Sequence, residues 1–310
     1  NIVFIVLSGI SILFLSAKKS KTLLKLSILT IFSIIVVTII FLSSEKQIKR
    51  NNAFIRRYMP HPIEKIGEYD LQSNSYYLSG MDDESIYLGN YNAPLFMMSI
   101  DTSLTQVNEF RVAIDSMHLP YRRVRISVNP PYFYLGDGTV PVLFRGKTDE
   151  WSATVFSYHD AYFTEFLVAD STNIGITTKS IVTSSTALGL LKKASDTINL
   201  ILNNDILTRQ LDGTFDSDGI LLWNDMHQQF IYTYFYRNNY QIADKNLSYQ
   251  SMGKTIDTIS RPVLDIAHYK TTDHYKLGGK SIMVNRQSAT YSDYLYIHSD
   301  RLGRYEDEEV

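Results

Sequence analysis

The chain has 310 residues, with 20% charged and 45% hydrophobic side chains, which excludes a disordered or collagen-like protein. It contains no cysteine, so these residues cannot form a disulfide framework, a thiolate metal site or a cysteine nucleophile. Residues 1–50 hold seven Lys/Arg and one acid, whereas the rest holds 23 basic and 31 acidic residues. This acidic body argues against nucleic acid as a partner, because phosphate binding needs a basic face.

Two apolar runs open the chain. The first covers residues 1–15, and we interpret it as the end of a membrane helix. The second, residues 26–42, has no charge and as a helix spans roughly 26 Å, close to a hydrocarbon core of about 30 Å. We predict two transmembrane helices within a membrane segment over residues 1–44. A signal peptide has a single apolar run, and a soluble hairpin would be more amphipathic.

A short basic loop at residues 18–21 separates the two runs. Short loops rich in lysine stay in the cytoplasm under the positive-inside rule. We therefore expect a cytoplasmic (inner) membrane protein whose body is extracytoplasmic, in the periplasm. Residues 45–63, which include Pro60 and Pro62, form the predicted linker.

From residue 64 onward, aromatic and aliphatic strands alternate with turns rich in glycine, asparagine and aspartate. Each unit fits a β-hairpin, because these turn residues accept left-handed backbone angles. Successive units begin on average roughly 50 residues apart, which favours propeller blades over a sandwich. We predict an all-β fold, a β-propeller-like repeat domain over residues 64–310. Its units are residues 85–101, 132–147, 161–179, 230–244 and 294–307.

Two stretches depart from this repeat. Residues 184–203 have leucine and isoleucine at helical spacing after a serine-rich start, so we predict a helical insertion there. The last unit ends in an acidic tail at residues 306–309, where a blade would continue with further strands. We expect the propeller to be incomplete at this end.

The order of these pieces resembles a group of bacterial MauE/DoxX-type redox-associated membrane proteins with a C-terminal extracytoplasmic domain. The run NIVFIVLSGISILFL is similar to the last helix of their four-helix membrane unit. The segments YLGNYNAPL, YFYLGDGTVPVLFRG and YTYFYRNNYQIAD are similar to parts of the C-terminal domain. The resemblance implies a cysteine-bearing redox unit upstream and a further helix that exports the body.

No catalytic pattern stands out. The seven histidines form no compact ligand motif, and no nucleophile elbow is present. Residues 216–219 (DSDG) have the opening rhythm of a calcium loop but lack its later ligands, so a calcium loop and a plain turn both remain open. We predict no catalytic residue, no metal site and no cofactor, and we expect these residues not to form an enzyme.

A binding role fits the repeats better. The strand tyrosines either pack between blades or form an aromatic face for a peptide or glycan. Arg145, Arg237 and Arg301 lie in or near corresponding hairpins, and we predict that they bind carboxylates of a partner. The predicted function is a membrane-anchored module that recognises a protein or peptide. The alternatives are a channel enzyme acting on a sugar or peptide, and a sensor or assembly scaffold.

Overall fold

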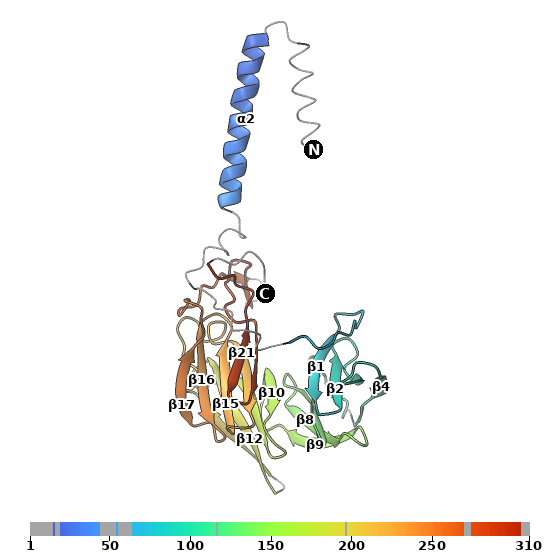
Figure 1. The fold of residues 1–310 in the computed structure, drawn as a ribbon. Helices are drawn as coiled ribbons and strands as arrows, with labels where there is room; N and C mark the ends of the chain where they lie inside the picture. Colours follow the sequence, from blue (N-terminus) through green and yellow to red (C-terminus); the bar gives the residue numbers. More distant parts are fainter. Residues whose placement is uncertain are drawn as a thin grey trace. The chain divides into compact units, whose positions relative to one another are not determined.

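The structure is a computed structural model that describes residues 15, 19–43, 54, 64–115, 117–195, 197–269 and 274–304 (Figure 1). By its internal packing the chain divides into two compact units. Residues 1–56 with residues 301–310 form one unit, and residues 57–300 form the other.

The first unit contains the apolar helix α2 (Lys19–Leu42). None of its side chains is buried, and the hydroxyl of Thr30 donates to the carbonyl of Leu26, so this polar group is satisfied within the helix. Within the described ranges it is the one helix long and apolar enough to cross a membrane, a property of both membrane anchors and signal sequences. The other predicted helix, over residues 1–15, lies outside the described residues except for Leu15.

The second unit is a β-propeller with four blades, each a four-stranded antiparallel meander. The first blade contains β1 (Tyr76–Met81), β2 (Ser85–Asn90), β3 (Phe96–Asp101) and β4 (Val107–Arg111). The second contains β6 (Arg125–Asn129), β7 (Tyr132–Asp137), β8 (Val142–Lys147) and β9 (Ser152–Tyr158), with β5 (Ala113–Ile114) parallel to β9. The third contains β10 (Glu165–Val168), β11 (Asn173–Lys179), β12 (Thr186–Ala194) and β13 (Thr197–Asn203). The fourth contains β14 (Gly219–Asn224), β15 (Gln229–Tyr234), β16 (Asn239–Asp244) and β17 (Tyr249–Lys254).

Two hairpins follow the fourth blade. They are β18 (Ile266–Tyr269) with β19 (His274–Leu277), and β20 (Gln287–Tyr291) with β21 (Tyr294–His298). The first strand of each blade is its innermost strand: β1 contacts β6, β6 contacts β10, β10 contacts β14, and β14 contacts β20. These inner strands therefore line the propeller axis.

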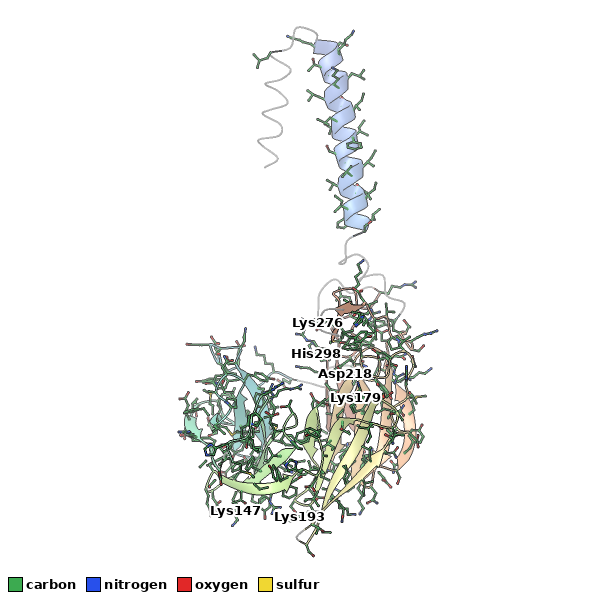
Figure 2. All side chains as sticks on the ribbon, turned by 180° about the vertical axis from the view of Figure 1, so that it is seen from behind. Lys147, Lys179, Lys193, Asp218, Lys276 and His298 are labelled. Carbon is green, nitrogen blue, oxygen red and sulfur yellow. The ribbon has the colours of Figure 1, made fainter. Side chains whose placement is uncertain are left out.

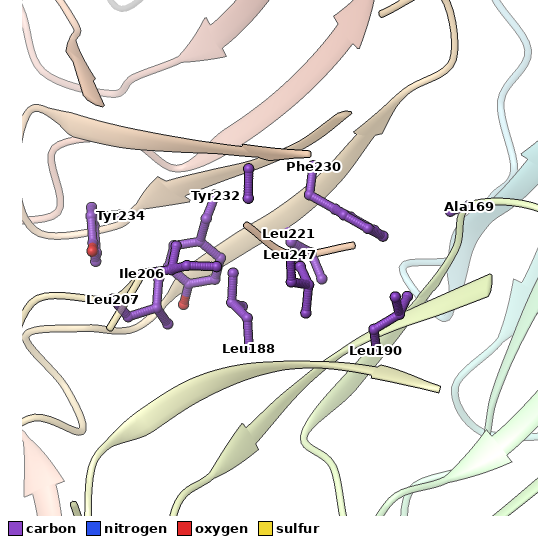
Figure 3. Close-up of a cluster of buried hydrophobic side chains, with 11 residues drawn as sticks. Ala169, Leu188, Leu190, Ile206, Leu207, Leu221, Phe230, Tyr232, Tyr234 and Leu247 are labelled. Atoms are coloured by element: carbon purple, nitrogen blue, oxygen red, sulfur yellow. The ribbon is translucent and has the colours of Figure 1, made fainter. Parts of the chain in front are cut away.

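The hydrophobic core lies between blades. One cluster joins the first and second blades, another the second and third, and the last joins the third and fourth (Figure 3). Blade sheets are therefore apolar on both faces, as a stack of sheets requires. Members from the paired blades include Met97 and Phe133, Leu143 and Ile176, and Leu190 and Phe230.

The helix predicted over residues 184–203 is wrong. This stretch forms β12 and β13, which pair from Leu188 opposite Asn203 to Ala194 opposite Thr197. Leu188 and Leu191, which suggested a helical stripe with Ile198 and Leu202, belong to the central strand β12, whereas the other two belong to the outer strand β13. β12 is buried on both faces, so the consecutive residues Leu190 and Leu191 both lie in the core. A buried strand and a buried helix give the same apolar run, and the β-branched residues of β13 favour the strand.

Three of the predicted hairpins are confirmed, as β2–β3, β7–β8 and β15–β16. The unit over residues 161–179 is β10–β11, the first two strands of its blade and not the middle pair. The unit over residues 294–307 begins with β21, and residues 305–307 lie outside the described residues.

Candidate functional site

Four charged side chains gather where three inner strands begin. Arg123 precedes β6, Arg125 opens it, and Glu165 opens β10. Asp218, labelled in Figure 2, directly precedes β14. Glu165 interacts electrostatically with Asp218 and with both arginines, and Asp218 interacts with Arg123. Arg123 and Asp218 are 95 positions apart in the sequence, and the neighbouring inner strands bring them to one end of the propeller axis.

A cavity of about 300 Å³ opens beside these side chains. Arg123, Arg125 and Glu165 line it, together with apolar surface from Phe163 and the phenol of Tyr77. Its walls come from the first three blades. Small-molecule and peptide sites combine apolar walls with a few convergent polar groups in this way.

Arg123 is positioned by a buried carboxylate. One oxygen of Asp137 accepts the backbone N–H groups of Arg122 and Arg123, the latter at 2.7 Å. The other oxygen accepts the N–H of Thr139 at 2.9 Å and its hydroxyl at 2.6 Å. Burial opposes ionisation of Asp137, but these donors outweigh it and lower the pKa of the carboxyl. The Asp137–Gly138 turn therefore fixes the backbone that carries Arg123.

Arg125 is held by aromatic rings. Its guanidinium carbon lies 4.2 Å from the ring centroid of Tyr91 and 5.5 Å from that of Tyr77, and Nη1 donates to the carbonyl of Val124 at 2.8 Å. The Tyr77 hydroxyl also accepts the N–H of Ile126 at 2.8 Å. Burial raises the pKa of Tyr77, so it remains a neutral phenol at the cavity wall.

The two carboxylates face water but are surrounded by protein on most sides. Burial raises the pKa of Glu165, the charge of Asp218 raises it further, and Arg123 and Arg125 oppose the shift. Burial also raises the pKa of Asp218, against the N–H of Gly219 and the charge of Arg123. Both groups therefore bind a proton more readily than an ordinary surface acid.

The acidic run over residues 216–219 has two different roles. Asp216 is buried, and its carboxylate accepts backbone N–H groups of Gln210, Leu211 and Gly213, with the Leu211 bond at 2.8 Å. It therefore anchors a loop, as a turn residue does, while Asp218 belongs to the central site. In the part of the chain that the structure describes, no three His, Asp or Glu side chains lie together as metal ligands.

The three predicted arginines have different surroundings. Arg145 stacks between Tyr132 and Phe156, with ring centroids 5.0 and 4.9 Å from its guanidinium carbon, and donates to the carbonyl of Ser171 at 3.0 Å. Arg237, on the fourth blade, is 1% exposed. Arg301 belongs to the other compact unit, so nothing places it beside these two. Their role in binding a partner stays a prediction.

Sequence reasoning missed Arg123, Arg125 and Glu165, and it read Asp218 only as part of a turn or calcium loop. The usable signal was a charged residue at or just before the start of the strands that open the second, third and fourth blades. It was hidden because the blade boundaries were not known. Of the tyrosines, Tyr134, Tyr232 and Tyr234 are buried in packing, while Tyr77 lines the central cavity.

The fold and site thus define a β-propeller with a charged, partly apolar cavity at one end of its axis. No family model matches the chain, and no curated protein matches it. The resemblance to MauE/DoxX-type proteins therefore stays a prediction.

The chain has a distant likeness to several solved structures. One is a chain of a nidogen–laminin complex, with 10% identity, 73% of each chain covered and a TM-score of 0.46. Another is a member of the DUF4221 family from Bacteroides vulgatus, with 11% identity, 77% of this chain and 92% of that chain covered, and a TM-score of 0.42. The dihydro-haem d1 dehydrogenase NirN has 16% identity over 66% of this chain and 43% of its own, with a TM-score of 0.34. Likeness at this level carries no argument about function.

Proposed function

We propose that this protein is a membrane-anchored, extracytoplasmic binding module that recognises a peptide or a peptide segment of a protein at the central site. The observation that carries the proposal is the mixed character of the cavity. Arg123, Arg125 and Glu165 line the cavity with apolar surface from Phe163 and Tyr77, and Asp218 interacts electrostatically with Glu165 and Arg123. A peptide offers matching groups, since it bears carboxylates, ammonium groups and apolar side chains together.

Each charged pair has a defined task in this proposal. The planar donor forks of Arg123 and Arg125 suit a carboxylate of the ligand. Glu165 and Asp218 suit an ammonium group, and a bound cation would relieve the repulsion between these two acids. The backbone bonds from Asp137 keep the arginine side in place before binding, which lowers the cost of ordering the site.

The test uses the full chain in detergent micelles and fluorescent tetrapeptides that differ only in charge. Arg123→Gln should selectively weaken the binding of acidic peptides, and Glu165→Gln should weaken the binding of basic peptides. Each loss should be about tenfold, as for one charged hydrogen bond. Lys147→Gln is the matched control, because Lys147 is exposed at the end of β8 and does not line the cavity (Figure 2). Equal peptide affinities in all three variants would remove the central site from the function.

A second candidate function is hydrolysis of a glycan or peptide in the channel. The observation that favours it is the pair of neighbouring carboxyl groups with raised pKa values, since a raised pKa keeps the proton that a general acid donates to a leaving group. Turnover of a glycan or peptide library that disappears in Glu165→Gln would favour the enzyme. Tight peptide binding without turnover would favour the binding module.

The membrane and redox parts of the proposal come from the sequence. The apolar helix α2 supports an anchor, and the basic loop at residues 18–21 supports export of the propeller. Attachment to a redox-associated membrane unit comes from the family resemblance alone. Protease added to intact spheroplasts should digest the propeller, whereas digestion only after lysis would reverse this topology.

A further inference from the structure

A second cavity, with a volume of about 610 Å³, lies beside the fourth blade. Its lining residues include Thr208, Asn239, Lys254, Ser260 and Arg261, none of which lines the central cavity. The volume falls within the range of about 300–1,000 Å³ that is usual for small-molecule sites.

The walls of this cavity are fixed by hydrogen bonds. Asn239 and Lys254 are opposite each other in the β16–β17 ladder, so their side chains lie on the same face. The backbone N–H of Gln210 is bound by the Asp216 carboxylate, and its side-chain Nε2 donates to the carbonyl of Ser260 at 3.3 Å. The loop before β14 is thereby tied to the segment after β17.

The cavity is positively charged. Lys254 and Arg261 line it, and no Asp or Glu is among its lining residues in the described part of the chain. The acids in the neighbouring segments are engaged with backbone: Asp216 accepts three N–H groups, and Asp257 accepts that of Ile259 at 2.8 Å. These carboxylates therefore bind the backbone of the loops beside the cavity.

A third cation lies behind the wall. The buried Arg237 donates from Nη2 to the carbonyl of Thr208 at 2.7 Å and to its hydroxyl at 3.2 Å, and its guanidinium carbon lies 3.6 Å from the ring centroid of Tyr234. Its Nε and Nη1 have no hydrogen-bond partner within the described ranges. A buried guanidinium without a counter-charge is unfavourable, so an anion in the adjoining cavity would stabilise the fold.

We propose that this cavity is a second ligand site that takes a small organic oxyanion, a phosphate or a carboxylate. Lys254 and Arg261 contact the anion, and Arg237 adds positive charge from behind Thr208. The amide groups of Gln210 and Asn239 suit hydroxyl groups on the rest of such a ligand. The site stands apart from the peptide site proposed for the central cavity.

Isothermal titration of the full chain in detergent micelles tests the proposal with three probes of one size: glycerol 3-phosphate, glycerate and glycerol. At least one anion should bind, and glycerol should not. The tighter anion identifies the phosphate or the carboxylate as the preferred group. Raising the salt from about 0.05 M to about 0.5 M should weaken the binding.

Variants assign the binding to this cavity. Lys254→Gln and Arg261→Gln should each lower anion affinity about tenfold. Lys147→Gln should leave the affinity within about twofold of wild type, a shift too small for a lost charged contact. Arg237→Gln should also weaken anion binding. If that variant does not fold, the Lys254→Gln/Arg261→Gln double variant tests the proposal in its place. No binding of either anion at about 10 mM, or unchanged binding in the folded double variant, would overturn the proposal.

Discussion

Replacing Asp137 should affect both the stability of the second blade and the geometry of the central site. Its two carboxylate oxygens accept four hydrogen bonds, from the N–H groups of Arg122, Arg123 and Thr139 and from the Thr139 hydroxyl. Asp137→Ala removes the acceptor, so these four donors lose their hydrogen bonds at a buried position. Hydrogen bonds to a charged group contribute about 1.5–3 kcal/mol each but do not add, so we expect a loss of about 3–4 kcal/mol.

The comparison with Asp137→Asn sharpens this prediction. An amide offers only one acceptor oxygen, and its NH₂ group would face donors whichever way it turned. Asn should therefore be almost as destabilising as Ala, although it is nearly the same size. Asp149→Asn is the control, because Asp149 is exposed in a turn, and surface changes of this kind usually stay within about 0.5 kcal/mol.

Urea unfolding of the full chain in mild detergent, followed by tryptophan fluorescence, measures the effect. Trp151 packs on Phe133 with ring centroids 5.0 Å apart, in the core between the first two blades, so it reports on this part of the propeller. Because the pKa of Asp137 is lowered in the folded state, its contribution is present at neutral pH and is lost as the pH falls below about 4. The stability of Asp137→Ala and of Asp137→Asn should therefore change less than that of wild type as the pH falls. An Asp137→Asn protein as stable as wild type would refute this account of the turn.

Three further predictions follow from single contacts. Gly138→Ala should destabilise the fold by about 3 kcal/mol or more, because a Cβ there would lie 1.8 Å from the backbone oxygen of Phe163, just before β10. Gly279→Ala should be tolerated, because a Cβ there meets nothing within 4 Å. Equal melting temperatures for the two variants would contradict the close packing. The raised pKa values of Glu165 and Asp218 mean that the folded state holds protons more tightly, so stability from these groups is present at low pH and declines as the pH rises through their folded pKa values. The stability of the Glu165→Gln/Asp218→Asn variant should depend less on pH above about 4, the ordinary pKa of these acids. An unchanged dependence would count against the clustering of the two acids. Arg145→Lys keeps the charge but loses the stacked guanidinium, so it should lower the free energy of unfolding by about 1 kcal/mol. Thermal unfolding measures this loss, with Lys147→Gln as the control. A loss of partner capture without a loss of stability would instead favour a binding role for Arg145.

The repeating hairpins were predictable because local chemistry specifies them. Asp137–Gly138 and Asn238–Asn239 stand between aromatic strands, and both pairs mark the turn of a middle hairpin. The third blade was misread because its middle hairpin has the segment LGLLKKA, which is as compatible with a helix as with a doubly buried strand. With the blades aligned, the second strands of the four blades begin at Ser85, Tyr132, Asn173 and Gln229.

The central site was not predictable, because it depends on non-local geometry. Arg123, Glu165 and Asp218 each precede or begin a strand, which is unremarkable in a linear sequence. Only the contacts between neighbouring inner strands bring them to one end of the axis. The same holds for Asp137, since two of its three partner N–H groups lie 14 and 15 residues earlier in the chain.

The buried aspartates Asp137 and Asp216 separate the shape of the loops from the chemistry that the loops display. They bind backbone N–H groups, which every residue other than proline carries, so the loop conformation does not depend on which side chains follow. The ligand-facing positions at residues 123, 165 and 218 can then change charge or size while the scaffold stays the same. Such a propeller can acquire a new specificity by a few substitutions at strand starts, without passing through an unstable intermediate sequence.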